Sequence, residues 1–588
     1  MKSAETKNHS KIIYILCFLT FGVPFLFGYG IVPLTNFTAE IIAATGFGLL
    51  LIITSRKDSN YQLGYISPLL LAPAIVLTMS CIAQYATKGF NHTDAYLTVI
   101  GYFLLSAAGI YFGNMVAAQP NALHWPSPIA ITILFAGLVA AGGSAAQYFS
   151  VDGQSILLSP VSDSGRTFGF IRQPNHQGGF LSLAIASCLF LHQIGKLGPA
   201  TAIFSSTLLT FALLTTGSRT ALIQLFSILS IAFLFSRNPT SKIRGIALSI
   251  AAFTIIAWTM LYWSASSGGL DFYGNQKLTQ TASEGFGVRK TLWLQTMQMI
   301  GDCHWTGCGI LHYPATYYLG GYSTQTGLVF SNAHNIVLQL AFDHGILVLA
   351  TVIFLAALGL IKAKIKINSP AKNYALSIIF CIGVHSMLEF PLWYTYFLIP
   401  ASFFWGFLLC PNRPQDAQNR KTIPTLSFSP APIIVGTLTI ATCVTMTQDY
   451  YKITPIYTPG IPSTLEQRVA AAQEAYWFDR FKFFPIFQKD TLFTSFPETN
   501  IDKAVELGCI MSEPWHQTSM IKVLADNGFT ADVKWLLYLY KKMTNGNMDI
   551  FAATLQTSRN EAAQELIAYT KDPNEPKKST EAFRKFCE

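Results

Sequence analysis

Residues 331–361 read SNAHNIVLQLAFDHGILVLATVIFLAALGLI, a polar opening followed by a long apolar run. From position 334 onward the run is longer than the roughly 20 residues that a helix needs to cross the hydrocarbon core of a bilayer. The whole chain agrees, since 51% of its 588 residues are hydrophobic and 12% are charged, against about a quarter charged in an ordinary soluble domain. The stretch 334–361 therefore predicts a membrane-spanning helix with a histidine and an asparagine at its polar end.

Comparable apolar stretches recur through the first three-quarters of the chain and predict about thirteen membrane-spanning helices. We expect spans near 11–31, 37–54, 66–86, 94–115, 128–148, 177–194, 200–216, 219–236, 244–264, 334–361, 373–390, 392–410 and 430–446. The first stretch is expected to remain as a span, because it has no small-residue cleavage site and more helices follow it. The predicted fold is an all-α, polytopic integral membrane protein.

The distribution of Lys and Arg predicts the orientation of these helices. With the N-terminus inside, the inner segments hold sixteen Lys and Arg, and the outer segments before the C-terminal tail hold seven. The net charge of +9 then serves mainly as an anchor at the inner face. A nucleic-acid partner has little support, since no Lys/Arg cluster is interleaved with aromatic residues. We expect a bacterial inner-membrane protein with membrane lipid as a partner and with loops 149–176 and 265–333 in the periplasm.

Two domains are predicted, a transmembrane catalytic domain over 1–446 and a periplasmic α-helical domain over 447–588. The tail has no further span and more charge than the rest, with helical patterns at 465–478, 503–511 and 531–542. Short amphipathic helices in succession are typical of tetratricopeptide-like hairpins, although the repeat period of about 34 residues is not clean here. In the larger loop we expect one helix, over Val288–Ile300.

Polar residues gather, on this topology, at the outer membrane interface, where ionisable groups are functional candidates by default. His334 is the catalytic candidate. We expect Ser331 or Asn332 to cap the helix that follows and to place the imidazole in its first turn. A histidine with a pKa of about 6.5 is a natural general base for a hydroxyl nucleophile, and an amphipathic anchor at the interface is the alternative.

The other candidates would bind or position a substrate. Arg172, Arg219 and Arg289 have the planar fork that binds phosphate or pyrophosphate, while anchoring to lipid headgroups explains each one singly about as well. The positioning candidates are Gln173, Asn175, Asn335, Glu389 and Tyr394. The amide side chains of Gln173 and Asn175 could orient a sugar or a phosphate oxygen, or these residues could merely form a turn. Glu389 could pair with an arginine or hold His334, and an aromatic belt explains Tyr394 equally well.

Missing motifs also carry information. The outer loops have no Asp-x-Asp pair and no His-x-x-x-His, so we expect no metal ion. Neither a Walker loop nor a dinucleotide fingerprint occurs, so no cofactor is expected. Cys303, Cys308, Cys509 and Cys587 would lie in an oxidising periplasm, where four cysteines allow three pairings. A Cys303–Cys308 bridge is the local option and a zinc site the weaker one.

The chain resembles the O-antigen ligase superfamily through SNAHNIVLQLAFDHGI, TGSRTA and VRKTLWLQTMQMI with the following GCGI. IRQPNHQGGF and HSMLEFPLWYTYFLIP, together with the helical tail, are similar to the bacterial protein O-oligosaccharyltransferases, the pilin glycosylation ligases. The resemblance covers positions from about 160 to 410 and is weak elsewhere. Here the combination of motifs is specific, and one motif alone would not be.

That family moves a glycan preassembled on undecaprenyl pyrophosphate to Ser or Thr of periplasmic proteins such as pilin. The resemblance implies that His334 is the family's catalytic histidine, Gln173 its glutamine, and Arg219 and Arg289 its arginines. Relatives often have Tyr where Phe390 stands here, which leaves Tyr394 as the nearest hydroxyl.

Three other functions remain open. A ligase onto lipid A core and a glycan polymerase would share the fold. A transporter would belong to a different class and predicts mid-membrane polar residues and internal repeats. In this chain the polar residues are predicted at one edge, and no repeat is evident.

Overall fold

The chain folds entirely into helices and connecting segments in the part that the structure, a computed structural model, describes. The described residues are 2–28, 30–55, 68–88, 93–119, 125–149, 166–235, 243–266, 275–303, 305–322, 330–365, 367, 369–410, 430–458, 463–482, 514–544, 548–556, 558, 561–571 and 576. They contain no β-strand, so the predicted all-α fold class is confirmed. The fold divides into two compact units.

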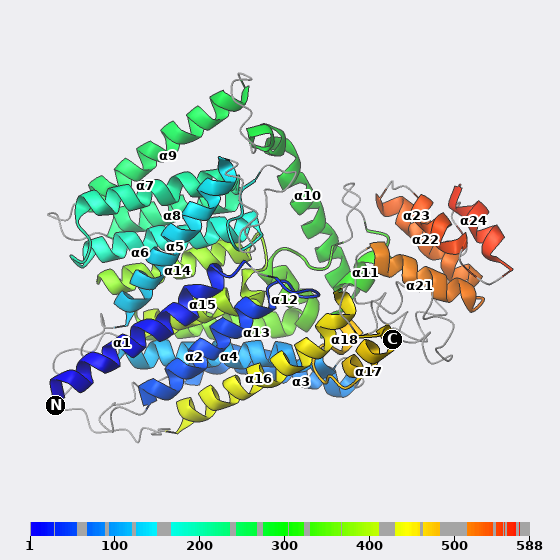
Figure 1. The fold of residues 1–588 in the computed structure, drawn as a ribbon, viewed down its shortest axis with the longest axis horizontal. Coiled ribbons are helices and arrows are strands. Elements are labelled where there is room, and N and C mark those ends of the chain that lie inside the picture. The colour runs from blue at the N-terminus through cyan, green and yellow to red at the C-terminus, as the bar shows by residue number, and fades with distance from the viewer. Residues whose placement is uncertain are drawn as a thin grey trace. The chain divides into compact units, whose positions relative to one another are not determined.

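Unit 1 comprises residues 1–76, 101–283 and 352–447. Its own helices are α1 (Lys2–Phe21), η1 (Val23–Phe25), α2 (Phe37–Ser55), α5 (Pro126–Tyr148), α6 (Pro174–Gln193), α7 (Pro199–Thr215), α8 (Arg219–Phe235), α9 (Ile243–Ser266), α14 (Pro370–Ser386), η3 (Pro391–Trp393) and α15 (Thr395–Leu409). Figure 1 shows α5, α6, α7 and α8 side by side. Helix α6 packs closely against α8 at Gly178, where an added Cβ would lie 2.6 Å from the Cβ of Ala221. Small residues thus allow the close helix contacts that stabilise packing in a membrane.

Unit 2 comprises residues 77–100, 284–351 and 448–588. Its own helices are α11 (Tyr313–Leu319), α12 (Ile336–His344), α17 (Leu465–Gln473), α18 (Asp479–Lys482), α21 (Pro514–Asp526), α22 (Thr530–Thr544), α23 (Asp549–Gln556) and α24 (Ala563–Lys571). Five helices have residues in both units: α3 (Pro68–Lys88), α4 (Thr93–Ala117), α10 (Asn275–Asp302), α13 (Ile346–Ala363) and α16 (Ala431–Tyr457).

Seven described helices are long and apolar enough to cross a membrane, which supports a multi-pass membrane protein. These are α2, α3, α4, α5, α9, α13 and α16, and four shorter apolar helices cover Lys11–Phe25, Pro199–Thr215, Arg219–Phe235 and Thr395–Leu409. Each of the thirteen predicted stretches overlaps at least one helix. The number of crossings stays a prediction.

The predicted span 334–361 was wrong as a single helix. The chain breaks at Gly345, whose φ of 86° lies in the left-handed region, so that α12 ends at His344 and α13 begins at Ile346. Two other boundaries also differ. Helix α10 is longer than the expected Val288–Ile300, and α16 continues to Tyr457, past the expected end at 446.

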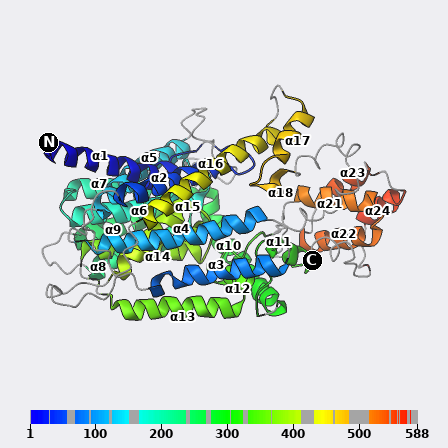
Figure 2. The ribbon, with the colours of Figure 1, turned by 90° about the horizontal axis from the view of Figure 1, so that it is seen from below.

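The described tail residues between 514 and 571 form a small helical bundle, visible in Figure 2 as α21 to α24. Its core includes Met520, Leu536 and Phe551, all nearly or fully buried. Tyr318 of α11 joins this core and donates its hydroxyl to the carbonyl of Leu536 at 3.0 Å. The helices expected at 465–478 and 531–542 correspond to α17 and α22, whereas the one expected at 503–511, and residues 150–165 of the predicted outer loop, lie outside the described residues.

Candidate active site

In unit 1, an asparagine joins two segments that are far apart in the sequence. Gln173 caps α6 by accepting a hydrogen bond from the backbone N–H of His176 at 2.6 Å, and this fixes Asn175 in the first turn. The Asn175 Nδ2 donates to Glu389 Oε1 at 2.8 Å. Glu389 is only 5% exposed. A carboxylate buried in this way needs hydrogen-bond donors in place of water, and the Asn175 amide is one such donor.

Arg166 completes the arrangement and was missed as a site residue. Its Nη2 donates to Asn175 Oδ1 at 3.0 Å, and its Nε donates to the Thr216 carbonyl at 2.8 Å. The Asn175 amide therefore bridges a guanidinium and a carboxylate. Through this amide Glu389 is connected to Arg166, which is not one of the arginines singled out from the sequence, and its pairing with Arg172, Arg219 or Arg289 stays a prediction. The only signal in the sequence was a lone arginine in a Gly- and Ser-rich outer loop.

Two buried histidines lie behind this bridge, and neither was predicted. The His176 ring makes edge contacts with His385 and Tyr394, with centroids 5.3 and 4.7 Å apart. Both histidines are at most 1% exposed. Gly179 provides the space, because a Cβ there would lie 2.9 Å from His385 Nδ1. Tyr394 thus packs on the histidine that follows Asn175, and its role at the site stays a prediction.

Glu40 fixes the start of the helix next to Tyr394 and was also missed. Its Oε2 accepts hydrogen bonds from the Thr395 N–H and hydroxyl, both at 2.6 Å, and from the Tyr102 hydroxyl at 3.1 Å. Helix α15 begins at Thr395 and is not capped by the side chain of Tyr394, so this carboxylate from α2 serves as its cap. A single acid within an apolar span was the available signal.

Arg172 and Arg219 are exposed, each next to the start of a helix. Arg172 precedes the α6 cap and has a φ of 61°, and Arg219 is the first residue of α8. Helix N-termini carry partial positive charge and bind anions through backbone N–H groups. The two arginines therefore add full charges where the backbone already favours a phosphate group.

In unit 2, His334 lies ahead of its helix, contrary to the sequence-based expectation. Asn335 is the cap of α12, and its Oδ1 accepts hydrogen bonds from the backbone N–H groups of Val337 and Leu338 at 3.0 and 3.1 Å. Ser331 or Asn332 had been expected to cap, with His334 in the first turn, and that was wrong. Asn332 instead accepts from the His334 N–H at 3.0 Å.

The environment of His334 is a half-buried aromatic corner. Its ring lies edge-on to Phe330 with centroids 5.7 Å apart, and Phe330 contacts Tyr317 in the same way at 6.0 Å. Beneath it, Tyr313 shares a 2.7 Å hydrogen bond with Thr296. Burial raises the pKa of Tyr313 above its ordinary value, so this hydroxyl stays protonated and structural.

Arg289 lies in α10, three residues before Leu292. Leu292 and Met299 follow it at three and ten residues, on one side of the helix. Both are fully buried in a cluster with Ala333, the neighbour of His334, and with Tyr317. Arg289 itself is half-buried. Arg289 and His334 are thus each close in the sequence to a residue of this hydrophobic cluster.

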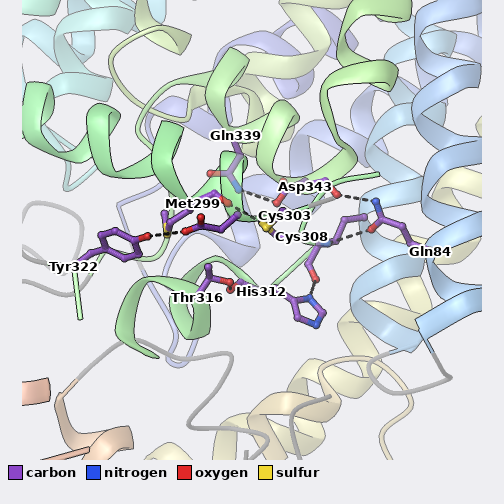
Figure 3. The surroundings of a disulfide bond; sticks show 11 residues. Gln84, Met299, Cys303, Cys308, His312, Thr316, Tyr322, Gln339 and Asp343 are labelled. Atoms are coloured by element: carbon purple, nitrogen blue, oxygen red, sulfur yellow. Dashed lines mark hydrogen bonds between the residues drawn. A yellow bond between two sulfur atoms is a disulfide. The ribbon is translucent and has the colours of Figure 1, made fainter. Parts of the chain in front are cut away.

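A disulfide closes the loop between α10 and α11. Figure 3 shows Cys303 joined to Cys308, which confirms the local pairing option, while Cys509 and Cys587 lie outside the described residues. The Cys308 N–H donates to the Phe342 carbonyl in α12 at 2.8 Å. The neighbouring Gly307 lies so close to Gly345 that an added Cβ would be 2.5 Å from the Gly345 nitrogen. The disulfide loop therefore packs directly on the break between α12 and α13.

No group of three or more His, Cys, Asp or Glu side chains is arranged as metal ligands among the described residues. Metal independence stays a prediction.

Two family models match the chain. Residues 204–353 match the O-antigen ligase family. Over this region, about a quarter of its length, the chain is similar to the O-antigen ligase family. This region contains Arg219, Arg289, His334 and Asn335. Residues 373–494 match the family described as virulence factor membrane-bound polymerase, C-terminal, and this region contains Glu389 and Tyr394.

Two curated proteins that the chain resembles come from Acinetobacter baylyi. One is a general O-oligosaccharyltransferase, 26% identical over 272 residues, which are 44% of this chain and 46% of the relative. The other is a ComP-specific O-oligosaccharyltransferase, 24% identical over 276 residues, which are 44% of this chain and 47% of the relative. The alignments thus span about half the length of the curated relatives. No solved structure matches the chain.

Proposed function

We propose that the chain transfers a preassembled glycan en bloc from undecaprenyl pyrophosphate to a Ser or Thr of periplasmic proteins such as pilin. The observation that carries this proposal is the position of His334. It is half-buried, directly ahead of the N-terminus of α12, and within the region that matches the O-antigen ligase family. The names of the two relatives add support for a protein acceptor, since both are O-oligosaccharyltransferases.

The proposed chemistry is a displacement at the anomeric carbon. His334 takes the proton of the acceptor hydroxyl as its oxygen forms the new glycosidic bond. The bond between the anomeric carbon and the pyrophosphate oxygen breaks, and undecaprenyl pyrophosphate leaves with the electron pair. Arg289 meets the charge on this leaving group through its planar fork. A direct displacement of this kind inverts the anomeric centre.

In unit 1, we assign Arg172 and Arg219 to the donor pyrophosphate, because both are exposed at helix N-termini. Asn175, Glu389 and Tyr394 position the substrate. Gln173 and Asn335 were predicted to do the same, but their side-chain oxygens cap α6 and α12. Their contribution to substrate binding therefore comes through the amide nitrogen or through the helix N-termini that they order.

A mass shift on an acceptor tests the proposal. The chain is co-expressed with a pathway that makes a lipid-linked glycan and with candidate pilins, and the acceptors are analysed by intact mass and peptide mapping. We expect the acceptor to gain the mass of the whole glycan on Ser or Thr. If no exported protein is modified while the lipid-linked glycan accumulates, protein transfer is excluded for these acceptors.

The two family descriptions favour a second candidate of the same fold, a ligase onto lipid A core or a glycan polymerase. The same cells distinguish these activities. A ligase would place the glycan on lipid A core, and a polymerase would extend the lipid-linked glycan into a ladder of repeats. The protein-transfer proposal expects neither product when the acceptor pilin is present in excess.

The orientation of the chain is tested by reporter fusions. Because Lys and Arg number sixteen on one side and seven on the other, fusions after residues 160, 300 and 480 are expected to report a periplasmic location. Fusions after residues 240 and 368 are expected to report the cytoplasm. Alkaline phosphatase and green fluorescent protein, used in parallel, give opposite signals on the two sides. A cytoplasmic signal at 300 would place Arg289 on the side away from exported acceptors and would refute the mechanism.

Transfer is expected to continue in the presence of EDTA. The proposed site neutralises the leaving group with guanidinium groups and uses no carboxylate cluster to hold an ion. The measurement is the rate of transfer by purified, EDTA-treated protein, with and without added Mg²⁺ or Mn²⁺. A known metal-dependent glycosyltransferase treated in parallel serves as the control. Loss of activity that either ion restores would reveal a metal site.

A further inference from the structure

The backbone of His334 is held in a conformation that histidine seldom adopts. Its φ is 48°, in the left-handed region where the Cβ of an L-residue crowds the backbone. Such a conformation persists only where the surrounding structure imposes it, and functional sites are where it occurs most. The residues that impose it on His334 are therefore candidates for a role in the reaction.

Three amide side chains hold the backbone on both sides of His334. Asn332 accepts from the His334 N–H at 3.0 Å, and Asn335 accepts from the first N–H groups of α12. Gln339 reaches back from the first turns of α12, and its Oε1 accepts from the Ala333 N–H at 2.9 Å. The N–H groups of Ala333 and His334 are thus both bound by side chains of the same short segment.

Asp343 determines which way the Gln339 amide faces. The Gln339 Nε2 donates to Asp343 Oδ1 at 3.0 Å, and Figure 3 shows the two side chains meeting. The Asp343 Oδ1 accepts this bond, so it pairs with the NH2 side of the amide and leaves the amide oxygen directed toward the Ala333 N–H. Gln339 is only 6% exposed, which keeps water from replacing either bond.

The Asp343 backbone is anchored in turn. The Gln84 Nε2 donates to the Asp343 carbonyl at 2.7 Å, and the Gln84 Oε1 accepts from the Ile310 N–H at 3.2 Å. Ile310 follows the disulfide loop, so this glutamine connects α3, α12 and that loop within unit 2 (Figure 3).

We propose that Gln339 and Asp343 are positioning residues for His334. Asp343 fixes the orientation of the Gln339 amide, Gln339 fixes the Ala333 peptide, and the left-handed turn that results directs the imidazole. The inference rests on the proposed function in so far as His334 is its general base. Neither residue touches the substrate in this account.

A swap of the two side chains tests the proposal. Gln339→Glu alone places two carboxylates together, and we expect kcat to fall about 10–100-fold, since small misplacements of a reacting group cost that much. The KM for the acceptor is expected to change little. Adding Asp343→Asn restores a donor opposite the new carboxylate, which still accepts from the Ala333 N–H. The double variant should therefore recover most of kcat.

Asp343→Asn alone is the matched control, because its amide oxygen can still accept from Gln339, and we expect a smaller loss of kcat than for Gln339→Glu. A double variant no better than Gln339→Glu would overturn the proposal, as would wild-type kcat for Gln339→Glu. A role in packing alone would not give this reciprocal rescue of kcat.

A thermal measurement tests the turn without any glycan transfer, and it also decides the matter if Gln339→Glu fails to accumulate. His334→Gly suits a positive φ and His334→Ala does not. We expect the Gly variant to have the higher Tm, by about 1–3 °C in detergent. In the Gln339→Leu background the turn can relax, and this difference should shrink.

Equal Tm values in the first pair, or an unchanged difference in the Gln339→Leu background, would overturn the positioning role. If the thermal results hold and no variant, including the wild type, transfers glycan to any acceptor, the proposed function fails and the structural assignment stands.

Discussion

His334→Ala is expected to lower the rate of glycan transfer about 10²–10⁴-fold, the usual loss when a general base is removed. Membrane abundance should stay near the wild-type value, because the ring is half-buried and its described aromatic contact is an edge contact with Phe330. The measurement is the initial rate of transfer by purified protein at matched concentration. His334→Gly is the companion, since glycine suits the φ of 48° and a loss there cannot come from backbone strain.

His344→Ala is the matched control for His334→Ala. This second histidine is 2% exposed, and its Nδ1 lies 3.0 Å from the Ser80 hydroxyl. Its removal leaves a cavity and an altered contact with α3, so we expect thermal stability to fall at least as clearly as activity. If His334→Ala transferred glycan at nearly the wild-type rate, His334 would be an interface anchor and the base would lie elsewhere.

Gly345→Ala is expected to destabilise the protein by about 2–5 kcal/mol, among the larger effects of a single methyl group. Gly345 has a φ of 86°. Its added Cβ would overlap the Trp305 carbonyl and lie 2.6 Å from the Gly307 nitrogen. These are backbone atoms of the disulfide loop, which cannot turn aside as a side chain can. We expect lower membrane abundance and a lower apparent Tm.

Gly359→Ala is the control, at a glycine inside the helix α13 that follows Gly345. A Cβ at Gly359 would meet the Leu70 side chain at 3.4 Å, an ordinary contact, and alanine favours a helix by about 1 kcal/mol over glycine. This variant should therefore accumulate at least as well as the wild type. Similar behaviour of the two variants would mean that the close packing at Gly345 is not required.

The positions of the apolar helices were predictable, because the thickness of a bilayer imposes a length that can be read from one sequence. The break at Gly345 was not. Glycine is common in membrane helices. Gly345 differs from the others through its close contact with Gly307, a residue that precedes it in the sequence by more than the length of α11. Likewise, the extension of α10 to Asn275 could not be read from its polar N-terminal half.

At the candidate site, residues that stand out by their type were predictable, and residues whose role depends on a distant partner were not. His334 and Glu389 stood out as costly groups near a membrane. Arg166 did not, because its role depends on Asn175, which reaches Glu389 across 214 positions. The cap of α12 was misplaced for a local reason. Ser331, Asn332 and Asn335 are all residue types that cap helices well. The left-handed turn at His334 is what makes Asn335 the cap of α12.

The disulfide between Cys303 and Cys308 also has a consequence for the order in which the protein matures. Both cysteines precede Gly345 in the chain, and thiols are kept reduced in the cytoplasm. On the proposed orientation, the bond forms only after this segment has been exported. A newly inserted chain would then contain every residue of the α12 turn, but the loop from Cys303 to Cys308, on which Gly345 packs, would not yet be closed by its disulfide. The proposed activity would therefore appear only after oxidation, and a host that lacks thiol-oxidising enzymes in its envelope would accumulate the reduced protein.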